Sequence, residues 1–216
     1  AVESSGKILI QYFEKLHDSR QKNKNIRDLV TEVDFLSEKN IKKILSSRFP
    51  KHNIIAEESG GLNINSEYCW HVDPIDGTVN YSQGIPLCAV SIGLELNGEI
   101  IVGAVNNPFT GELFYASQGN GAFLNGHAIR LSEKDKLEEG LYIAAFSSDS
   151  DDNKDREYQT FGEMNENTRG VLRIGSAALA LAYLACGRID GFWAKGLYSW
   201  DIVGGLALVM EAGGQI

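Results

Sequence analysis

Residues 89–106 read AVSIGLELNGEIIVGAVN, which is two apolar runs separated by the pair Asn97-Gly98. An Asn-Gly pair between apolar runs is a strong signal of a β-hairpin, because a type I′ turn needs two residues with positive φ. Further short apolar runs bounded by turn residues continue to Leu131. We therefore expect a meandering antiparallel sheet in this part of the chain.

The chain on either side of this sheet has other periodicities. Roughly the first 50 residues carry apolar side chains at helix spacing, and strand and helix patterns alternate after residue 140 in α/β order. These patterns predict a layered αβαβα sandwich of the α+β or α/β class. Residues 1–140 would form an N-terminal helix pair and a large antiparallel sheet, and residues 141–216 an α/β half. Because Gln215-Ile216 resembles the start of a strand, we expect that half to be truncated.

Composition narrows the class of protein. The 216 residues include 29 Asp and Glu against 20 Lys and Arg, a net charge of −9. A surface that coats nucleic acid needs clustered Lys and Arg, so we expect no nucleic-acid partner, whereas hard cations take carboxylate oxygens. Cys69, Cys88 and Cys186 lack CxxC spacing, which is typical of thiols in a reducing compartment. The longest apolar run, residues 177–186, is too short for a membrane span. We expect a cytoplasmic protein without a membrane partner.

The segment Asp73-Pro74-Ile75-Asp76-Gly77-Thr78 follows a strand that we expect the proline to end. Two carboxylates at this spacing on a sharp bend can face one point, as Mg²⁺ ligands or an acid/base pair must. Gly77 lets the backbone approach a ligand, and Thr78 offers a hydroxyl at a possible helix start, where N–H groups favour phosphate. The alternative is a plain Asp-Gly turn capped by its own side chains.

Three further segments carry candidate site residues. Glu57-Glu58 comes directly after a short apolar strand, as Asp73 does, and open sheets bind ligands beyond such strand ends. Asp201 lies in the first turn of an apolar helix whose Gly204-Gly205 pair calls for close packing or close ligand approach. Gly175-Ser176 precedes an Ala-rich helix, where N–H groups can meet a hydroxyl or a phosphate. The alternatives are a solvated loop, a helix-dipole charge and an ordinary N-cap, respectively.

Two remaining features suggest supporting roles. His71 precedes Asp73 by two residues on the same strand face, where we expect a packed position rather than a catalytic one. Residues 147–155 are rich in acids but lack the glycine and the final Glu of an EF-hand, so we expect a solvated loop.

Five segments together resemble the inositol monophosphatase family. DPIDGT at 73–78, followed by the segment from WD at 200–201 to EAGG at 211–214, is similar to the two signatures of that family. The other matching segments are LVTEVD at 29–34, AEES at 56–59 and GSAA at 175–178. The resemblance covers essentially the whole chain. It implies a Mg²⁺-dependent, Li⁺-sensitive phosphatase that forms a homodimer.

The resemblance also assigns roles to residues of this chain. It implies two or three Mg²⁺ ions per site, held by Glu57, Asp73, Asp76, Asp201 and the backbone carbonyl of Ile75. The residues that it implies for activating the attacking water are Glu57, Thr78 and Asp34. The residues that it implies for contacting the substrate are Asp76, Gly77, Thr78, Gly175, Ser176, Ala177 and Asp201. Such metal ions would neutralise the phosphate, lower the pKa of a bound water and stabilise the leaving alkoxide.

The implied reaction is hydrolysis of a small phosphate monoester by metal-activated water, with inositol 1-phosphate as the first candidate substrate. Many inositol-specific members carry a Glu where this chain has Ala194, which offers no side-chain acceptor to an inositol hydroxyl. A 3′-nucleotide bisphosphate, fructose 1,6-bisphosphate or histidinol phosphate therefore stays open as a substrate, as does a catalytically weak regulatory role. Lys195 is either a contact to a second phosphate or an exposed charge.

Overall fold

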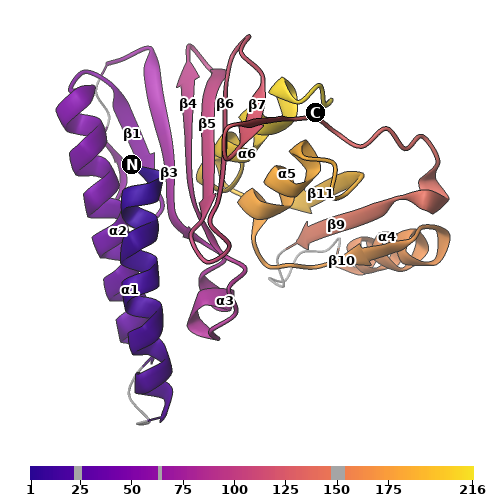
Figure 1. Ribbon diagram of the computed structural model, residues 1–216, viewed down its shortest axis with the longest axis horizontal. Helices are drawn as coiled ribbons and strands as arrows, with labels where there is room; N and C mark the ends of the chain where they lie inside the picture. Colours follow the sequence, from indigo (N-terminus) through magenta and orange to yellow (C-terminus); the bar gives the residue numbers. More distant parts are fainter. Residues whose placement is uncertain (22–25, 63–64, 147–153) are drawn as a thin grey trace.

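The computed structural model describes residues 1–21, 26–62, 65–146 and 154–216. These ranges form layers in the order helix pair, sheet, helix pair, sheet and helix (Figure 1). The predicted αβαβα sandwich is thus confirmed. The predicted acid-rich loop lies outside the described residues as far as residue 153.

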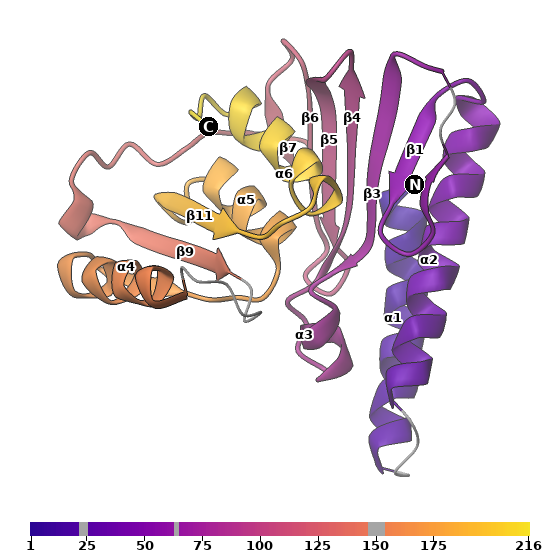
Figure 2. The same cartoon turned by 180° about the vertical axis from the view of Figure 1, so that it is seen from behind.

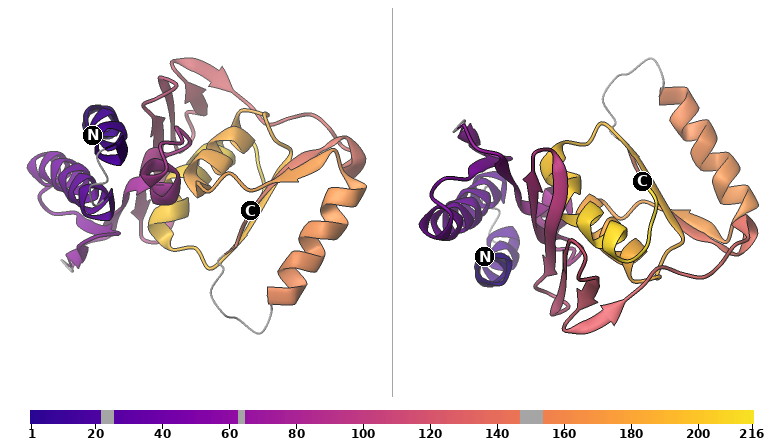
Figure 3. Two further views of the ribbon diagram at one scale, coloured as in Figure 1. Left: turned by 90° about the horizontal axis from the view of Figure 1, so that it is seen from below. Right: turned by 90° about the horizontal axis from the view of Figure 1, so that it is seen from above.

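The first layer consists of α1 (Val2–Gln21) and α2 (Ile26–Arg48), which pack side by side on one face of the large sheet (Figures 1 and 3). The buried face of α2 has helical spacing, because the side chains that it buries are three or four residues apart. They are Val30, Val33, Asp34, Ser37, Glu38, Ile41 and Leu45. Three of these are polar, and they lie toward the sheet edge that carries the site.

The large sheet has the strand order β2-β1-β3-β4-β5-β6-β7-β8. Its strands are β1 (Asn53–Ala56), β2 (Gly60–Leu62), β3 (Tyr68–Asp76), β4 (Ala89–Leu96), β5 (Glu99–Asn107), β6 (Glu112–Ser117), β7 (Ala122–Leu124) and β8 (His127–Ile129). All neighbours are antiparallel except β1 and β3, which are parallel. Asn97 and Gly98 connect β4 to β5 with φ values of 53° and 83°, which confirms the predicted hairpin.

One local prediction in this sheet was wrong. Gly60 and Gly61 belong to the short edge strand β2, which the sequence did not indicate because its glycines show no apolar alternation. Strand β3 does not end at Pro74 but continues to Asp76. The register between β3 and β4 shifts between Asp73 and Asp76. This irregularity accommodates a residue that has no N–H to donate.

The other face of the large sheet is covered by α5 (Ala177–Ala185) and α6 (Ser199–Glu211) (Figure 2). Helix α6 lies directly on glycine backbone. A Cβ at Gly103 would overlap the carbonyl oxygen of Gly204, and a Cβ at Gly93 would lie 2.7 Å from the nitrogen of Gly204. The close packing predicted for Gly204 is therefore confirmed, and it holds the middle of α6 against β4 and β5.

The outer layers come from the second half of the chain. Strands β10 (Gly170–Leu172), β9 (Leu141–Phe146) and β11 (Gly191–Lys195) form a parallel sheet in that order, with α4 (Lys154–Asn167) on its outer side. The remaining elements are α3 (Thr78–Ser82) and a 3₁₀ turn, η1 (Leu137–Glu139).

The three cysteines are free. In the described ranges, no helix combines the length and apolar character that crossing a membrane requires. The division of the chain at residue 140 stays a prediction.

Candidate active site

The parallel pairing of β1 and β3 brings two predicted carboxylates to one sheet edge. Ala56 lies opposite Val72, and the N–H of Glu57 donates to the carbonyl oxygen of Val72 over 3.2 Å. Glu57 therefore follows the end of β1 beside Asp73, which lies within β3, so the two carboxylates meet as the sequence predicted although only one of the two strands ends there.

The turn after Asp73 is ordered by hydrogen bonds between its own side chains and backbone. The N–H of Ile75 donates to Asp73 Oδ1 at 3.0 Å, and Thr78 Oγ1 donates to the carbonyl oxygen of Ile75 at 3.0 Å. Gly77 has a φ of 93°, and a Cβ there would lie 2.9 Å from the carbonyl oxygen of Leu87. The turn thus contains the side-chain capping that the sequence left as an alternative, and only glycine fits at position 77.

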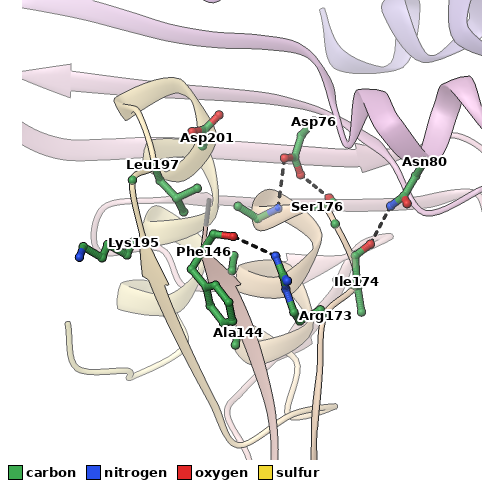
Figure 4. A pocket seen from close by; sticks show the side chains of 14 residues that line it. Asp76, Asn80, Ala144, Phe146, Arg173, Ile174, Ser176, Lys195, Leu197 and Asp201 are labelled. Carbon is green, nitrogen blue, oxygen red and sulfur yellow. Dashed lines mark hydrogen bonds between the residues drawn. The ribbon is translucent and has the colours of Figure 1, made fainter. Parts of the chain in front are cut away.

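Asp76 connects this turn to α5. Its Oδ1 accepts from the N–H of Ala177 at 3.1 Å, and its Oδ2 accepts from the N–H of Ala178 at 2.8 Å and from Ser176 Oγ. Ser176 Oγ accepts in turn from the N–H of Leu179 at 3.2 Å, as an N-cap does. The predicted substrate residues 175–177 are therefore held against the turn that carries Asp76 (Figure 4).

Asn80 is a site residue that the sequence reasoning missed. Its Nδ2 donates to the carbonyl oxygens of Leu87 at 2.7 Å and Ile174 at 2.6 Å (Figure 4). The side chain thus ties α3 to the segment that carries Gly175. Its only signal in the sequence is its place shortly after the Asp-Gly turn.

Two polar residues of α2 were also missed. Glu38 accepts from the N–H of Glu58 at 2.8 Å and from Ser59 Oγ, and Ser37 Oγ donates to the carbonyl oxygen of Pro74 at 3.0 Å. These contacts hold both acid-bearing turns against α2. The sequence did indicate these residues, because Ser37 and Glu38 follow Asp34 at helical spacing and lie on the same face of α2 as its buried apolar residues.

Asp201 lies in the first turn of α6, where its Oδ2 accepts from the N–H of Tyr198 at 2.7 Å. The same turn is fixed to the sheet by His71, which is 4% exposed. His71 Nδ1 lies 2.9 Å from Ser199 Oγ, and its Nε2 lies 3.0 Å from a carboxylate oxygen of Glu95. An ionised carboxylate only accepts, so Nε2 carries a proton toward Glu95. The packed position predicted for His71 is confirmed.

The carboxylates of the site raise one another's pKa values. Burial raises the pKa of Asp73 well above its usual range, and the charges of Asp76, Glu57 and Asp201 add to this effect. Burial, opposed by a hydrogen bond with Asp73, raises the pKa of Glu57 to about 7. Burial raises the pKa of Asp201. Burial also raises the pKa of Asp76, to about 6, although hydrogen bonds from Ser176, Ala178 and Ala177 oppose this rise. Several ionised carboxylates in one buried place repel each other unless a cation lies between them.

The donor set fits a hard divalent cation in its chemistry. All the predicted ligands, four carboxylates and the carbonyl of Ile75, offer oxygen, which Mg²⁺ prefers. Across the described part of the chain, however, no three His, Cys, Asp or Glu side chains stand in a ready-made metal-binding group. Part of the reason is that the carboxylate oxygens of Asp76 and Asp201 accept hydrogen bonds from N–H groups at the N-termini of α5 and α6. Each carboxylate oxygen still retains lone pairs for a cation.

Two cavities adjoin the Asp76–Asn80 turn. One, of about 440 Å³, is lined by the predicted substrate residues Asp76, Gly175, Ser176, Ala177 and Asp201 together with Asn80, Ala144, Ala145, Phe146, Arg173, Ile174, Lys195, Gly196 and Leu197. The other, of about 540 Å³, is lined by all three residues predicted to activate water, Asp34, Glu57 and Thr78, and also by Val30, Thr31, Glu58, Val79, Ser82 and Gln83. The residues predicted to activate water thus line one cavity, and most of the predicted substrate contacts line the other. Thr78, predicted for both roles, lines the cavity with Asp34 and Glu57, and Gly77 lines neither cavity.

Asp34 is the most unusual acid of the second cavity. It is 3% exposed, and its Oδ1 has no hydrogen-bond partner. Burial, followed by the charges of Glu58, Glu57 and Glu38, raises its pKa to about 8. Thr78, to which the resemblance assigns the same role, donates its hydroxyl hydrogen to the carbonyl oxygen of Ile75.

Comparisons with known proteins agree with this architecture. A family model described as the inositol monophosphatase family matches residues 1–216. The chain is 40% identical over 217 residues to an inositol-1-monophosphatase of Synechocystis, covering 100% of the chain and 75% of the relative. It is 38% identical to a Nus factor SuhB of Pseudomonas aeruginosa, covering 100% of the chain and 82% of the relative. A solved structure of inositol monophosphatase from Anabaena superposes with a TM-score of 0.87 at 40% identity, covering 100% of this chain and 79% of that one.

Proposed function

Because the chain belongs to the inositol monophosphatase family, we propose that it hydrolyses a small phosphate monoester with Mg²⁺, and that inositol 1-phosphate is the first candidate substrate. The family consists of metal-dependent phosphatases, so the class of enzyme is phosphoric monoester hydrolase. The observation that carries the proposal is the set of neighbouring carboxylates Glu57, Asp73, Asp76 and Asp201, of which Asp73 and Asp76 are buried, Asp76 and Asp201 line one cavity, and Glu57 lines the other.

Four carboxylates and the Ile75 carbonyl would hold the metal. When bound, Mg²⁺ neutralises the phosphate and lowers the pKa of a coordinated water. The chain's own groups supply the rest of the chemistry. Asp34, Glu57 and Thr78 line one cavity and orient the attacking water there. The backbone N–H groups of Gly77 and Thr78 bind phosphate oxygens at the start of α3.

The other cavity positions the leaving alcohol. Ser176 and Ala177, held by Asp76, form the wall that meets the hydroxyl groups of the substrate. Water attacks phosphorus directly, the bond from phosphorus to the alcohol oxygen breaks, and the alcohol leaves with a proton. The products are the free alcohol and inorganic phosphate, and no phosphoenzyme forms.

A phosphate-release panel over inositol 1-phosphate, sugar, nucleotide and histidinol phosphates tests this proposal. We expect Mg²⁺-dependent release from at least one monoester. We also expect Asp73→Asn and Asp201→Asn to lower kcat/KM by roughly 100-fold or more, because each removes a metal-ligand charge. The matched control is Asp135→Asn, the same change at an exposed position, which leaves activity unaltered. If the wild-type chain released phosphate from none of these substrates, only a regulatory role would remain.

Two further properties follow from the family and belong to the same proposal. We propose that the chain forms a homodimer and that Li⁺ inhibits it. Sedimentation of the purified protein and a Li⁺ titration of the phosphate-release assay measure both in one preparation.

A further inference from the structure

We infer that His71 and Ser199 form a positioning contact for the metal site, which holds Asp201 of α6 close to Asp73 of β3 before a cation binds. The inference rests on the proposed function, because it concerns how the proposed metal ligands are arranged. His71 and Ser199 line neither of the two cavities described above and are not among the implied ligands. Their effect on the metal would pass through Asp201.

His71 lies on the face of the large sheet that carries Asp73. The two side chains are two positions apart on β3 and therefore project from the same face of the sheet. Val72, between them, packs instead with apolar residues of α1 and α2 on the other face. His71 is 4% exposed. Burying its two ring nitrogens costs free energy unless both are hydrogen-bonded, and both are.

The imidazole of His71 is fixed from two sides. Its Nε2 carries a proton toward a carboxylate oxygen of Glu95 on β4, 3.0 Å away. A neutral imidazole then has no hydrogen on Nδ1, so the hydroxyl of Ser199, 2.9 Å away, donates to that nitrogen. The sheet thus presents an oriented acceptor, and the first residue of α6 donates to it.

The path from Ser199 to Asp201 is short. Asp201 lies in the same turn, and its Oδ2 accepts from the N–H of Tyr198 at 2.7 Å. Tyr198 directly precedes Ser199, so the carboxylate is bound to the piece of backbone that His71 holds. Residues 199–202 are only partly buried, whereas Val203 and the two glycines that follow are buried. The first turn of α6 therefore depends on side-chain contacts more than the rest of the helix does.

The contact opposes an electrostatic repulsion. The charge of Asp201 contributes to raising the pKa values of both Asp73 and Glu57, which reflects how near these acids are to one another. In the absence of a cation, ionised carboxylates in this place push the first turn of α6 away from β3. A hydrogen bond between His71 of β3 and Ser199 of α6 resists this separation, so a cation meets ligands that are already close together.

The test removes the contact with Ser199→Ala, which leaves His71 and Glu95 in place. Calorimetric titration of the substrate-free protein with Mg²⁺ measures the effect. Since groups that orient metal ligands contribute about 10- to 100-fold in affinity, we expect the Kd for Mg²⁺ to rise by about tenfold. Ser199→Thr keeps a hydroxyl and should bind Mg²⁺ as the wild type does. Ser117→Ala is the matched control, because it removes a partly buried serine hydroxyl near the other end of α6, where the next turn binds Glu211. We expect it to leave the Kd unchanged.

A phosphate-release assay over a range of Mg²⁺ concentrations distinguishes positioning from catalysis. In Ser199→Ala we expect half-maximal activity at an about tenfold higher Mg²⁺ concentration. We expect the wild-type kcat once Mg²⁺ is saturating, because Asp201 is then held by its metal contact. A kcat that stays low at saturating Mg²⁺, an equal Kd in wild type and Ser199→Ala, or an equal loss of affinity in Ser199→Thr overturns the inference.

The proposed function can fail separately from this inference. If the wild type binds Mg²⁺ but releases no phosphate from the substrate panel, the proposed function is wrong, and the comparison of Kd values still decides the role of His71 and Ser199. If the wild type releases phosphate and Ser199→Ala matches it at every Mg²⁺ concentration, the inference alone is wrong. If the wild type binds no Mg²⁺, both are wrong.

Discussion

Asp34 provides the most quantitative prediction, because its environment can be tested without substrate or metal. Burial and three neighbouring acids raise its pKa from 3.8 to about 8. The folded protein therefore keeps a proton on Asp34 at neutral pH, whereas the unfolded chain has released it. An acid whose pKa is raised by folding makes the folded protein less stable as the pH increases. This loss of stability extends from the pKa of the acid in the unfolded chain, near 4, to its pKa in the folded protein, near 8.

The size of the effect follows from this window. One pH unit of differential proton binding corresponds to about 1.4 kcal/mol, so raising the pH from about 5.5 to about 7.5 removes about 2.5 kcal/mol of stability through Asp34. Asparagine has nearly the same shape and no titrating proton. We therefore expect Asp34→Asn to become more stable relative to wild type by about 2.5 kcal/mol over this pH interval. Any constant cost of the substitution cancels in the comparison.

Urea unfolding in EDTA at about pH 5.5, 6.5 and 7.5 measures this difference. Asp135→Asn serves as the control, because Asp135 is exposed and its replacement leaves the pH profile of wild type unchanged. A difference between Asp34→Asn and wild type that stays constant within about 0.5 kcal/mol over this interval refutes the assignment of Asp34 as a buried, protonated acid.

Two further predictions concern the packing of α6 and the metal. Gly103→Ala places a Cβ against the carbonyl oxygen of Gly204 and 2.6 Å from Ala207 Cβ, so its unfolding free energy in urea should fall by roughly 1–3 kcal/mol. Gly162→Ala, whose Cβ meets nothing within 4 Å in helix α4, should instead become more stable, by up to about 1 kcal/mol. Mg²⁺ at about 100 times its Kd should stabilise the wild type by about 2.7 kcal/mol. Asp73→Asn should lose this gain, and an equal gain in both proteins would contradict the role of Asp73 as a ligand.

The layered fold was predictable because its signals are local. The Asn97-Gly98 hairpin, the helical spacing in the first helices and the alternation after residue 140 each depend on neighbouring residues. Pro74 shows where such reasoning fails. A proline lacks the N–H of a regular strand, but a register shift in the pairing with β4 lets β3 pass through it. Pairing with another strand is a tertiary property that the local pattern does not contain.

The sequence predicted the site residues that belong to a recognisable motif. It did not predict the residues that are distant in the chain and contact each other only in the folded protein. Glu57 and Asp73 each follow an apolar run, Asn53–Ala56 and Cys69–Val72, so their meeting followed from the expectation that these two runs are neighbouring strands. Asn80, Ser37 and Glu38 act on backbone groups far away in the chain, such as the carbonyl of Ile174, and no spacing reveals these partners. His71 is a similar case, because its partner Ser199 lies 128 residues further along the chain.

The capping contacts of Asp76 and Asp201 suggest how the site attracts its metal. Capping a helix and binding a cation were alternatives in the sequence, but the two roles are compatible, because a carboxylate oxygen that accepts one hydrogen bond retains a lone pair. Hydrogen bonds from Ser176, Ala178 and Ala177 hold the pKa of Asp76 to about 6 despite its burial, so this carboxylate is ionised at neutral pH. Asp34, without such donors to its Oδ1, has a pKa of about 8 and stays protonated. We propose that the N-terminus of α5 therefore keeps a negative charge in the cavity that Asp76 lines, where a cation can be drawn in.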